Sequence, residues 1–511
     1  MSDWSSGYMA DIDYTFGYYP ELNPFRLKLA FLNAGLVFPE TGTACELGYG
    51  QGLCVNIHAA GSLVDWYGTD FNPSQAAFAE EIASKSGANL KLYDESFDDF
   101  CSRKDLPDFD YIGLHGIWSW ISDENRHVIV DFIRRKLKVG GVLYISYNTM
   151  PGWAAFAPIR HLMNLHAEII GSDGKGILNR VDSAIDFTEK LLATNPLYST
   201  ANPQIPERIK NLTEQNRQYL AHEYFNKHWY PMHFSTMAKW LVPAKVQYAV
   251  SANFLDHIDM LHMSMEQQAF INQIPDPILR QSVRDFMVNQ QFRKDYWVKG
   301  ARRLTSLEQA EAVRCLNVIL TTHRHDINLK VTGALGEASL NEEVYNPILD
   351  ALSENTPKQV AQLEQELQLK GIGLAKILSA LVLLSGTGHI EMGQDEDSIG
   401  RAKKTSEKFN NYLMNKARGS NDIHFLASPV TGGGVHVGRI QQLFLLALIE
   451  GGHSPEDWAR KAWEALRVQD QKLIRDGKVL ESSEENLSEL LEQARIFKTK
   501  RLPILKTLQV I

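Results

Sequence analysis

The chain has 511 residues, of which 44% are hydrophobic, and its net charge is −9 at pH 7. This length predicts several hydrophobic cores, and an acidic chain without a long basic stripe argues against nucleic acid as a partner. Four cysteines without paired metal spacing, a polar N-terminus and apolar runs too short for a bilayer predict a cytoplasmic protein with free thiols and no membrane span.

The first 40 residues combine many aromatic side chains with an amphipathic, helix-like run from Phe25 to Leu36. Two interpretations are open. The aromatic residues form a lid over a ligand pocket, with Tyr18 or Tyr19 closing over it, or they are simply buried beside a helix that packs outside a sheet. The aromatic residues are Trp4, Tyr8, Tyr14, Phe16, Tyr18 and Tyr19.

Residues 41–150 alternate between strand and helix patterns, and we assign 41–165 to one α/β domain. The alternation predicts a Rossmann-like parallel sheet with helices on both faces, whose ligands lie beyond the C-terminal ends of the strands. We expect strands at 43–47, 64–69, 90–93, 109–114 and 142–147, and helices at 52–60, 74–86 and 123–137.

The first strand leads into a glycine-rich turn that begins at Glu46 and contains Gly48, Gly50 and Gly52. The second strand ends at Asp70, where a carboxylate can accept both hydroxyls of a ribose. The spacing G-x-G-x-G differs from the dinucleotide fingerprint, and an acidic residue before it suits an amino group and a sulfonium better than phosphates. The alternative is an ordinary strand–turn–helix corner. The pattern resembles motif I of the class I S-adenosylmethionine-dependent methyltransferases.

This resemblance implies roles for the other strand ends. Phe71 follows the ribose carboxylate, and the third corner, with Asp94, Ser96 and Phe97, would contact the adenine of S-adenosylmethionine. The fourth corner contains His115, which would hold the methionine part of the cofactor or act as a general base; a purely structural histidine is the alternative. No metal site is expected.

Two segments, 114–120 and 146–153, are similar to a bacterial methyltransferase family that bears a methyltransferase regulatory domain, and the similarity continues at 219–226 and 244–248. Protein lysine methyltransferases that act on bacterial outer-membrane proteins belong to this family. The resemblance implies a mainly helical regulatory domain at 166–330. Its segment 222–234, rich in histidine and aromatic residues, is either a packed core or a wall of the acceptor pocket, because the spacing of His222 and His228 does not fit a zinc helix.

The C-terminal part is expected to be helical. Residues 335–400 are typical of a winged-helix-like module, with helices at 340–352, 356–367 and 372–384, the second capped by Thr356, followed by a hairpin at Gly386 and Gly388. Lys376 is the one positive residue of the third helix, which favours packing or protein docking over DNA reading. Residues 401–420 are interpreted as a linker or exposed helix within a helical, winged-helix-like module at 401–511.

The function inferred from the sequence is methyl transfer from S-adenosylmethionine to a protein side chain such as lysine. The alternatives are O-methylation of a surface glycan or small molecule, and a cofactor-binding regulatory factor without turnover. The acceptor is expected between the fourth and fifth strand ends, with Trp118 in the pocket wall; a homodimer is allowed. The candidate catalytic residues are Tyr19, His115, Tyr147 and Asn148.

Overall fold

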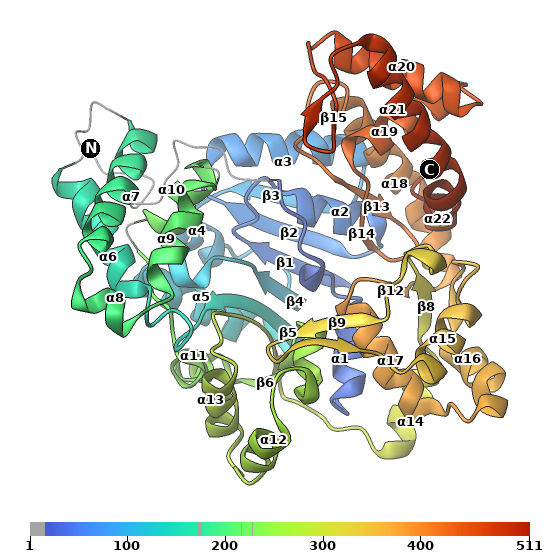
Figure 1. Ribbon diagram of the computed structural model, residues 1–511. Helices are drawn as coiled ribbons and strands as arrows, with labels where there is room; N and C mark the ends of the chain where they lie inside the picture. The colour runs from blue at the N-terminus through green and yellow to red at the C-terminus, as the bar shows by residue number, and fades with distance from the viewer. Residues whose placement is uncertain (1–15, 171–175, 216, 227) are drawn as a thin grey trace.

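The computed structural model describes residues 16–170, 176–215, 217–226 and 228–511. Trp4, Tyr8 and Tyr14 of the expected aromatic lid lie outside these residues, and so does the side chain of His222. The described chain is organised around one seven-stranded sheet, with a helical lobe beside it and further modules on its other side (Figure 1).

The sheet has the strand order β3-β2-β1-β4-β5-β7-β6. The first five strands run parallel, β7 pairs antiparallel with both of its neighbours, and β6 therefore runs in the same direction as β5. This arrangement confirms the Rossmann-like class I methyltransferase fold. The strands are β1 (Thr43–Leu47), β2 (Asp65–Asp70), β3 (Leu90–Asp94), β4 (Phe109–Leu114), β5 (Leu137–Asn148), β6 (Val246–Ser251) and β7 (Phe292–Lys299).

Helices cover the sheet as the alternating sequence pattern predicts. The helices α2 to α5 each follow a strand, and three of them have side-chain caps that fix where they begin: Asn72 accepts from the Ser74 N–H, Ser96 from the Asp99 N–H, and Ser122 from the Asn125 N–H. The helices are α1 (Leu27–Asn33), α2 (Leu53–Gly61), α3 (Pro73–Ser86), α4 (Phe97–Ser102) and α5 (Asp123–Lys136), and the short 3-10 helix η2 (Trp118–Trp120) lies before α5.

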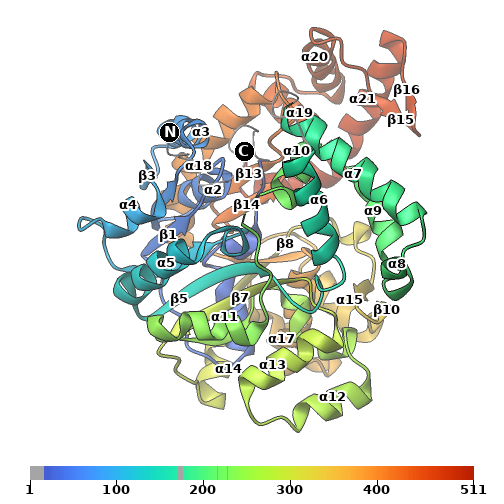
Figure 2. The same ribbon diagram turned by 90° about the vertical axis from the view of Figure 1, so that its left-hand side faces the viewer.

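The middle of the chain forms a helical lobe with a core of its own, at the left in Figure 1 and toward the viewer in Figure 2. Three further helices follow beside β6 and β7. The lobe contains α6 (Ala157–Ile169), α7 (Ile177–Ala193), α8 (Leu197–Ala201), α9 (Ile205–Thr213) and α10 (Arg217–Tyr224), and the later helices are α11 (Phe234–Leu241), α12 (Met265–Asn272) and α13 (Pro277–Met287).

This middle region also supplies β6 and β7 to the central sheet, which the sequence analysis did not predict. The reason lies in β7, where Arg293 and Asp295 are buried although their residue types are typical of a surface. Two buried charges at alternate positions remove the apolar face by which a strand is recognised.

Residues 306–393 form a module around the three-stranded sheet β11-β8-β12. The expected cap at Thr356 is wrong, because 358–359 pair with β8 as a strand and Gln359 caps the next helix. The segment after Gly386 also pairs with β8 and is not a local hairpin. The elements are α14 (Ser306–Arg314), β8 (Asn317–Leu320), β9 (Lys330–Gly333), β10 (Gly336–Ser339), α15 (Glu342–Ala351), β11 (Lys358–Gln359), α16 (Val360–Leu367), α17 (Leu374–Gly386) and β12 (Ile390–Gly393).

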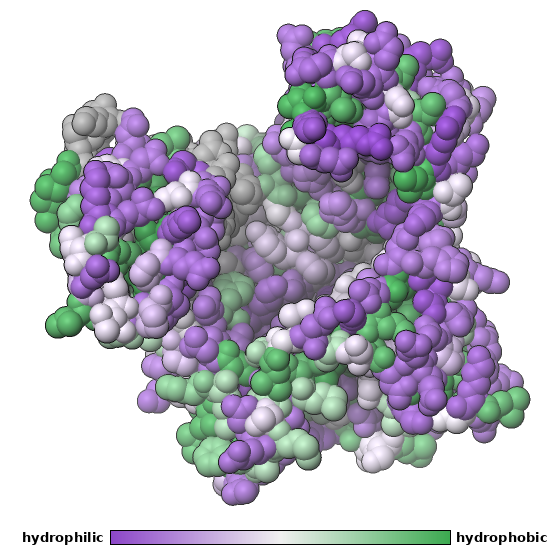
Figure 3. Space-filling model, viewed as in Figure 1, coloured by the Kyte–Doolittle hydropathy of each residue, from purple (hydrophilic) through white to green (hydrophobic). Residues whose placement is uncertain are grey.

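The C-terminal module packs against α2 and α3 of the central domain. Residues 401–420, interpreted above as a linker or exposed helix, belong to a long helix whose Phe409 and Leu413 are fully buried. The elements are α18 (Glu396–Lys416), β13 (Phe425–Ser428), β14 (Gly433–His436), α19 (Arg439–Ile449), α20 (Pro455–Arg467), β15 (Ile474–Arg475), β16 (Lys478–Val479), α21 (Ser483–Ile496) and α22 (Leu502–Thr507). Figure 3 shows the face between this module and the helical lobe hollowed toward the sheet.

In the described part of the chain, no helix by itself has the length and apolar character of a membrane span. One pair, 360–370 with 374–386, meets that criterion when the two helices are taken together, but the chain bends by 117° between them.

Candidate functional site

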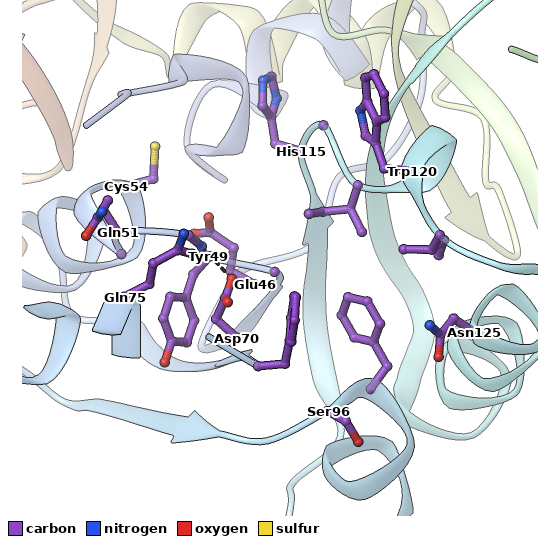
Figure 4. Close-up of a pocket in the computed structure, with 18 of the residues that line it drawn as sticks. Glu46, Tyr49, Gln51, Cys54, Asp70, Gln75, Ser96, His115, Trp120 and Asn125 are labelled. Carbon is purple, nitrogen blue, oxygen red and sulfur yellow. Dashed lines mark hydrogen bonds between the residues drawn. The ribbon is translucent and has the colours of Figure 1, made fainter. Parts of the chain in front are cut away.

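A cavity of about 400 Å³ lies at the C-terminal ends of β1, β2 and β4, as the fold predicts (Figure 4). It brings together residues from the glycine turn, from the ends of the next strands and from the N-terminal segment before α1. The residues that the sequence analysis named and that line it are Tyr19, Glu46, Gly48, Gly50, Gly52, Asp70, Phe71, Ser96, Phe97 and His115.

The glycine turn forms one wall of the cavity, and its backbone requires glycine. Gly48, Gly50 and Gly52 all have positive φ, at 71°, 59° and 68°. A Cβ at Gly52 would lie 2.4 Å from the Ala79 Cβ, and one at Gly48 would lie 2.5 Å from Ile117. The turn therefore keeps α2 close to α3 and leaves its backbone open to a ligand.

Two buried carboxylates face this cavity. Asp70 accepts backbone hydrogen bonds from Gly50 at 2.8 Å and from Asn72 at 3.0 Å, which hold it at the end of β2. Burial raises its pKa to about 6 in spite of these bonds. Glu46 is 4% exposed, and its Oε2 has no hydrogen-bond partner in the described structure. Burial, and secondarily the charge of Asp70, raise the pKa of Glu46 to about 8.

An unpartnered buried carboxylate is costly unless a ligand supplies its partner. Glu46 lies beside a glycine turn, so a cationic or hydrogen-bond-donating group can reach it without a clash. Asp70, on the next strand, retains oxygen lone pairs that two neighbouring hydroxyls can use. The pair therefore fits a ligand that carries an ammonium group at one point and a diol at another.

Beyond Asp70 the cavity is lined by an apolar, flat-sided section formed by Phe71, Phe97 and Ile117. Ser96 is at its edge, but its hydroxyl caps α4 by accepting from the Asp99 N–H at 3.2 Å. Asn125, in the first turn of α5, supplies a side-chain amide to the same section (Figure 4). Aromatic walls with one amide suit a heteroaromatic base.

The opposite end of the cavity is formed by His115 and Tyr19. Their rings are stacked with centroids 3.7 Å apart. His115 Nδ1 lies 2.7 Å from the Tyr144 hydroxyl, so Nε2 is the ring nitrogen that is left for a ligand. Burial lowers the pKa of His115 to about 3, so the imidazole is neutral across the physiological range. Trp120 also lies at this end (Figure 4), and His228 is a further lining residue of the cavity.

Three comparisons place this geometry among known proteins. Residues 216–299 match the family model described as a predicted methyltransferase regulatory domain. The uncharacterized protein sll1526 of Synechocystis is 40% identical over 512 residues, covering 99% of each chain. The chain belongs to the class I methyltransferase family that carries a methyltransferase regulatory domain.

Two other relatives extend the comparison. The uncharacterized protein RP789 of Rickettsia prowazekii is 26% identical over 352 residues, which cover 64% of this chain and 58% of that protein. The structure of PKMT2 from Rickettsia typhi in complex with AdoHcy has a TM-score of 0.68 at 17% identity, covering 94% of this methyltransferase and 98% of that chain. The fold likeness therefore extends over nearly the whole molecule.

Tyr147 and Trp118, which the sequence analysis expected in the acceptor pocket, do not line the methyltransferase cavity. Tyr147 is 1% exposed and donates to Asp295 at 2.9 Å, and Trp118 is fully buried with its Nε1 3.4 Å from Met232 Sδ. For Tyr147 the cause is that alternate residues of a strand point to opposite faces. Tyr147 points away from the face that carries Tyr144.

Asn148 lies on the same face of β5 as Tyr144 and Ser146, at the strand end. It is 4% exposed and is not among the residues that line the cavity; its backbone N–H donates to the Ser119 hydroxyl at 2.8 Å. Asp94, expected at the adenine, is exposed at the end of β3 and also lies outside the lining. Ser146 holds the fourth corner by accepting from the Gly116 N–H at 2.8 Å.

The side chains of the two candidate lid tyrosines of the methyltransferase point in different directions. Tyr19 lines the cavity, and its backbone N–H donates to Cys54 Sγ at 3.0 Å. Tyr18 points the other way: its hydroxyl lies 3.2 Å from His58 Nε2 and its ring packs 5.0 Å from Phe425. The N-terminal segment therefore crosses the cavity edge with one tyrosine facing the ligand site and one anchored between α2 and β13.

Several cavity residues were not singled out from the sequence. Two of them are within the glycine motif, and Trp120 lies within the fourth corner, so their positions carried a signal that was not used. Within 222–234, Tyr224 and Phe225 pack in the lobe core, and His228 lines the cavity. Outside 222–234, the lining residues that were missed are Gly17, Tyr49, Gln51, Leu53, Cys54, Gln75, Glu95, Gly116, Ile117, Trp120, Ile121, Ser122, Glu124 and Asn125. In the described ranges, no three His, Cys, Asp or Glu side chains are grouped to hold a metal ion.

Proposed function

We propose that this protein binds S-adenosylmethionine and transfers its methyl group to an amine nitrogen, with a lysine side chain of a protein as the acceptor. The observation that carries the proposal is the buried Glu46 carboxylate at a glycine turn, whose Oε2 has no hydrogen-bond partner among the described residues, next to Asp70 on the neighbouring strand. The two carboxylates match the ammonium group and the ribose diol of this cofactor. PKMT2 of Rickettsia typhi, which shares the fold, holds AdoHcy.

The remaining lining residues fit the rest of the cofactor. Phe71, Phe97 and Ile117 would enclose the adenine, and Asn125 would offer its amide to the ring edge. Bound S-adenosylmethionine supplies a methyl group on a sulfonium, which is already activated for displacement. The protein therefore has to align an acceptor lone pair and exclude water.

The basicity of His115 favours an amine over a hydroxyl as the acceptor. A neutral amine already carries the lone pair that attacks a methyl group, and an aromatic wall of Tyr19 and Trp120 lowers the pKa of an entering ammonium group by desolvating it. A hydroxyl would need a base to remove its proton, and a histidine with a pKa of about 3 is too weak for this task. His115 is therefore assigned to orient the amine through Nε2.

The position of this end of the cavity supports a macromolecular acceptor. His228 and the Trp229 ring, which lies 6.3 Å from the Trp120 ring, both belong to the segment that follows the helical lobe. Arg160 of α6 lies 4.5 Å from the Trp229 ring centroid and 5.8 Å from that of Trp120. An acceptor that reaches His115 can thus also contact the helical lobe.

The proposal is tested by incubating purified protein and labelled S-adenosylmethionine with cell extract, and then separating the products by size and chemical stability. Label in a protein band that survives alkaline treatment supports N-methylation, and Glu46→Gln should abolish it. Glu40→Gln, at an 88% exposed side chain, is the matched control and should behave as wild type. Label only in glycan or small molecules, or none with any extract fraction, would refute the proposed acceptor.

A further inference from the structure

An ion pair close to the acceptor end of the cavity has no part in the mechanism described so far. Lys294 Nζ, on β7, donates to Glu21 Oε1 at 2.6 Å, and Glu21 is 8% exposed. Arg26, another cation whose charge acts on Glu21, is held by Glu391 at 3.0 Å. The pair joins two segments that lie 273 residues apart in the chain, so it is a tertiary contact and not a local one.

Glu21 belongs to the turn that carries Tyr19 into the cavity. The short 3-10 helix η1 (Pro20–Leu22) follows Tyr19 directly, and the Leu22 N–H donates to the Tyr19 backbone oxygen at 3.1 Å. Tyr19 and Glu21 are therefore parts of one small hydrogen-bonded unit. Whatever holds Glu21 also determines where the Tyr19 ring stacks on His115.

The strand that holds Glu21 is β7. In the pairing of β5 with β7, Tyr296 lies opposite Tyr144, and Lys294 lies two residues before Tyr296 on the same face of the sheet. This is the face whose Tyr144 contacts His115. The Tyr296 hydroxyl donates to the Glu21 backbone oxygen at 2.9 Å. Thus β7 holds Glu21 at two points, at its backbone oxygen and at its carboxylate.

Stability alone does not explain this ion pair. Charges that are withdrawn from water are compensated only when their remaining hydrogen-bonding positions are filled, and Glu21 Oε2 is buried without a partner among the described residues. Burial has the largest effect on the pKa of His115, followed by the charge of Glu21, which raises it, and that of Lys294, which lowers it. Both charges therefore lie near the imidazole. Unlike an apolar contact, the pair fixes a distance and a direction between β7 and the turn.

We propose that Lys294 is a positioning residue of the methyltransferase site and acts through Glu21 and Tyr19 on His115. β7 lies within residues 216–299, which match the regulatory-domain model, so the ion pair is a link by which this segment reaches the acceptor end. The inference rests on the proposed methyl transfer, in which His115 and the Tyr19 wall align the amine. A misplacement of about 1 Å in such an arrangement can lower a rate by about 10²-fold.

Variants of the pair separate alignment from stability. Lys294→Met leaves the Glu21 carboxylate buried and unpaired, so it should unfold at a lower urea concentration than the wild type. The double variant Lys294→Met/Glu21→Gln has no unpaired charge and should regain the wild-type urea midpoint. Its methyl transfer should not recover. We expect kcat to be at least tenfold lower in Lys294→Met, in Glu21→Gln and in the double variant, with the KM for S-adenosylmethionine within threefold of wild type.

Two further variants serve as controls. Lys294→Arg retains a cation that can reach Glu21 and should keep kcat within threefold of wild type. Lys330→Met breaks an exposed ion pair with Glu337, which has the same 2.6 Å distance, and should change neither kcat nor the urea midpoint. A double variant that regains wild-type kcat together with its stability, or single variants with wild-type kcat, would show that the pair is only structural and would overturn the proposal.

Amide hydrogen exchange over residues 16–26 provides a readout that needs no acceptor. Exchange there should be at least tenfold faster in the double variant than in the wild type, whereas exchange over 43–52, at the glycine turn, should stay the same. If this change is seen but the wild type transfers no methyl group, the proposed function is refuted and the coupling of Lys294 to Tyr19 is still supported. Equal exchange over 16–26 in the wild type and the double variant would overturn the coupling itself.

Discussion

Glu46→Gln provides a quantitative test of the cofactor site. The folded protein holds the pKa of Glu46 at about 8, above its ordinary value of 4.5, because the carboxyl is buried next to Asp70. A folded state that binds a proton more tightly than the unfolded chain is stabilised at low pH and loses this stabilisation as pH rises through the folded pKa. Glutamine has the same shape and does not titrate.

The expected size follows from the pKa. The contribution of this group falls by about 1.4 kcal/mol per pH unit well below the folded pKa and by about half of that slope at the pKa itself, so ionisation of Glu46 removes about 2.3 kcal/mol of the free energy of unfolding between pH 6 and 8. Other titrating groups are common to both proteins. The difference in unfolding free energy between Glu46→Gln and the ligand-free wild type should therefore grow by that amount in favour of the variant.

Ligand binding should respond in the opposite sense. A cofactor ammonium group prefers the ionised carboxylate, so the affinity of the wild type for S-adenosylhomocysteine should rise from pH 6 to 8, and binding should release a proton. Calorimetry in buffers of different ionisation enthalpy measures that proton, and urea unfolding at each pH measures stability. Parallel pH profiles for wild type and Glu46→Gln, in both assays, would refute the assignment of the raised pKa to Glu46.

Three other substitutions separate the roles of the site residues. Gly52→Ala places a Cβ 2.4 Å from Ala79 at a φ of 68° and should weaken S-adenosylhomocysteine binding more than tenfold; wild-type affinity by calorimetry would contradict the tight turn. Tyr144→Phe removes the 2.7 Å contact with His115 and should lower methyl transfer about tenfold while cofactor affinity stays within twofold, and a loss of affinity alone would argue against an orienting role. Tyr147→Phe leaves the buried Asp295 without one hydrogen bond and should reduce unfolding free energy by about 1–3 kcal/mol, with cofactor affinity unchanged; a variant as stable as wild type in urea would disprove this.

The parallel half of the fold was accessible from the sequence because its strands and helices alternate with short, recognisable corners. The orientation of the side chains at the end of the fifth strand was not accessible from the sequence. A run of polar and aromatic residues such as 146–148 does not show which face of the strand points toward the cofactor. The orientation is set by β7, where the buried Asp295 carboxylate accepts the hydrogen bond from Tyr147 and is paired with Arg293. The pairing of β5 with a strand almost 150 residues later leaves no local pattern to read.

The cofactor side of the site was likewise more predictable than the acceptor side. Glu46, the three glycines and Asp70 act through local backbone geometry, so their spacing along the chain carries most of the information. His228 and Tyr19 reach the cavity only because separate modules pack there. Their residue types suggested a role, but their positions depend on contacts with the fourth corner: Tyr19 stacks on His115, and the N–H of Tyr230, two residues after His228, donates to the Ser119 backbone oxygen.

The C-terminal module is part of this arrangement although it contributes no described residue to the cofactor cavity. Tyr18 is held by His58 and Phe425, and a Cβ on Gly434 would come within 2.9 Å of its ring. Because the next residue is Tyr19, which stacks on His115, the β13–β14 hairpin sets where the cavity wall stands. The glycines of residues 432–434 are thus explained by close approach to the N-terminal segment: Gly432 meets Phe25, and the other two meet Tyr18. The position of the cavity wall at Tyr19 therefore depends on contacts made by the C-terminal module.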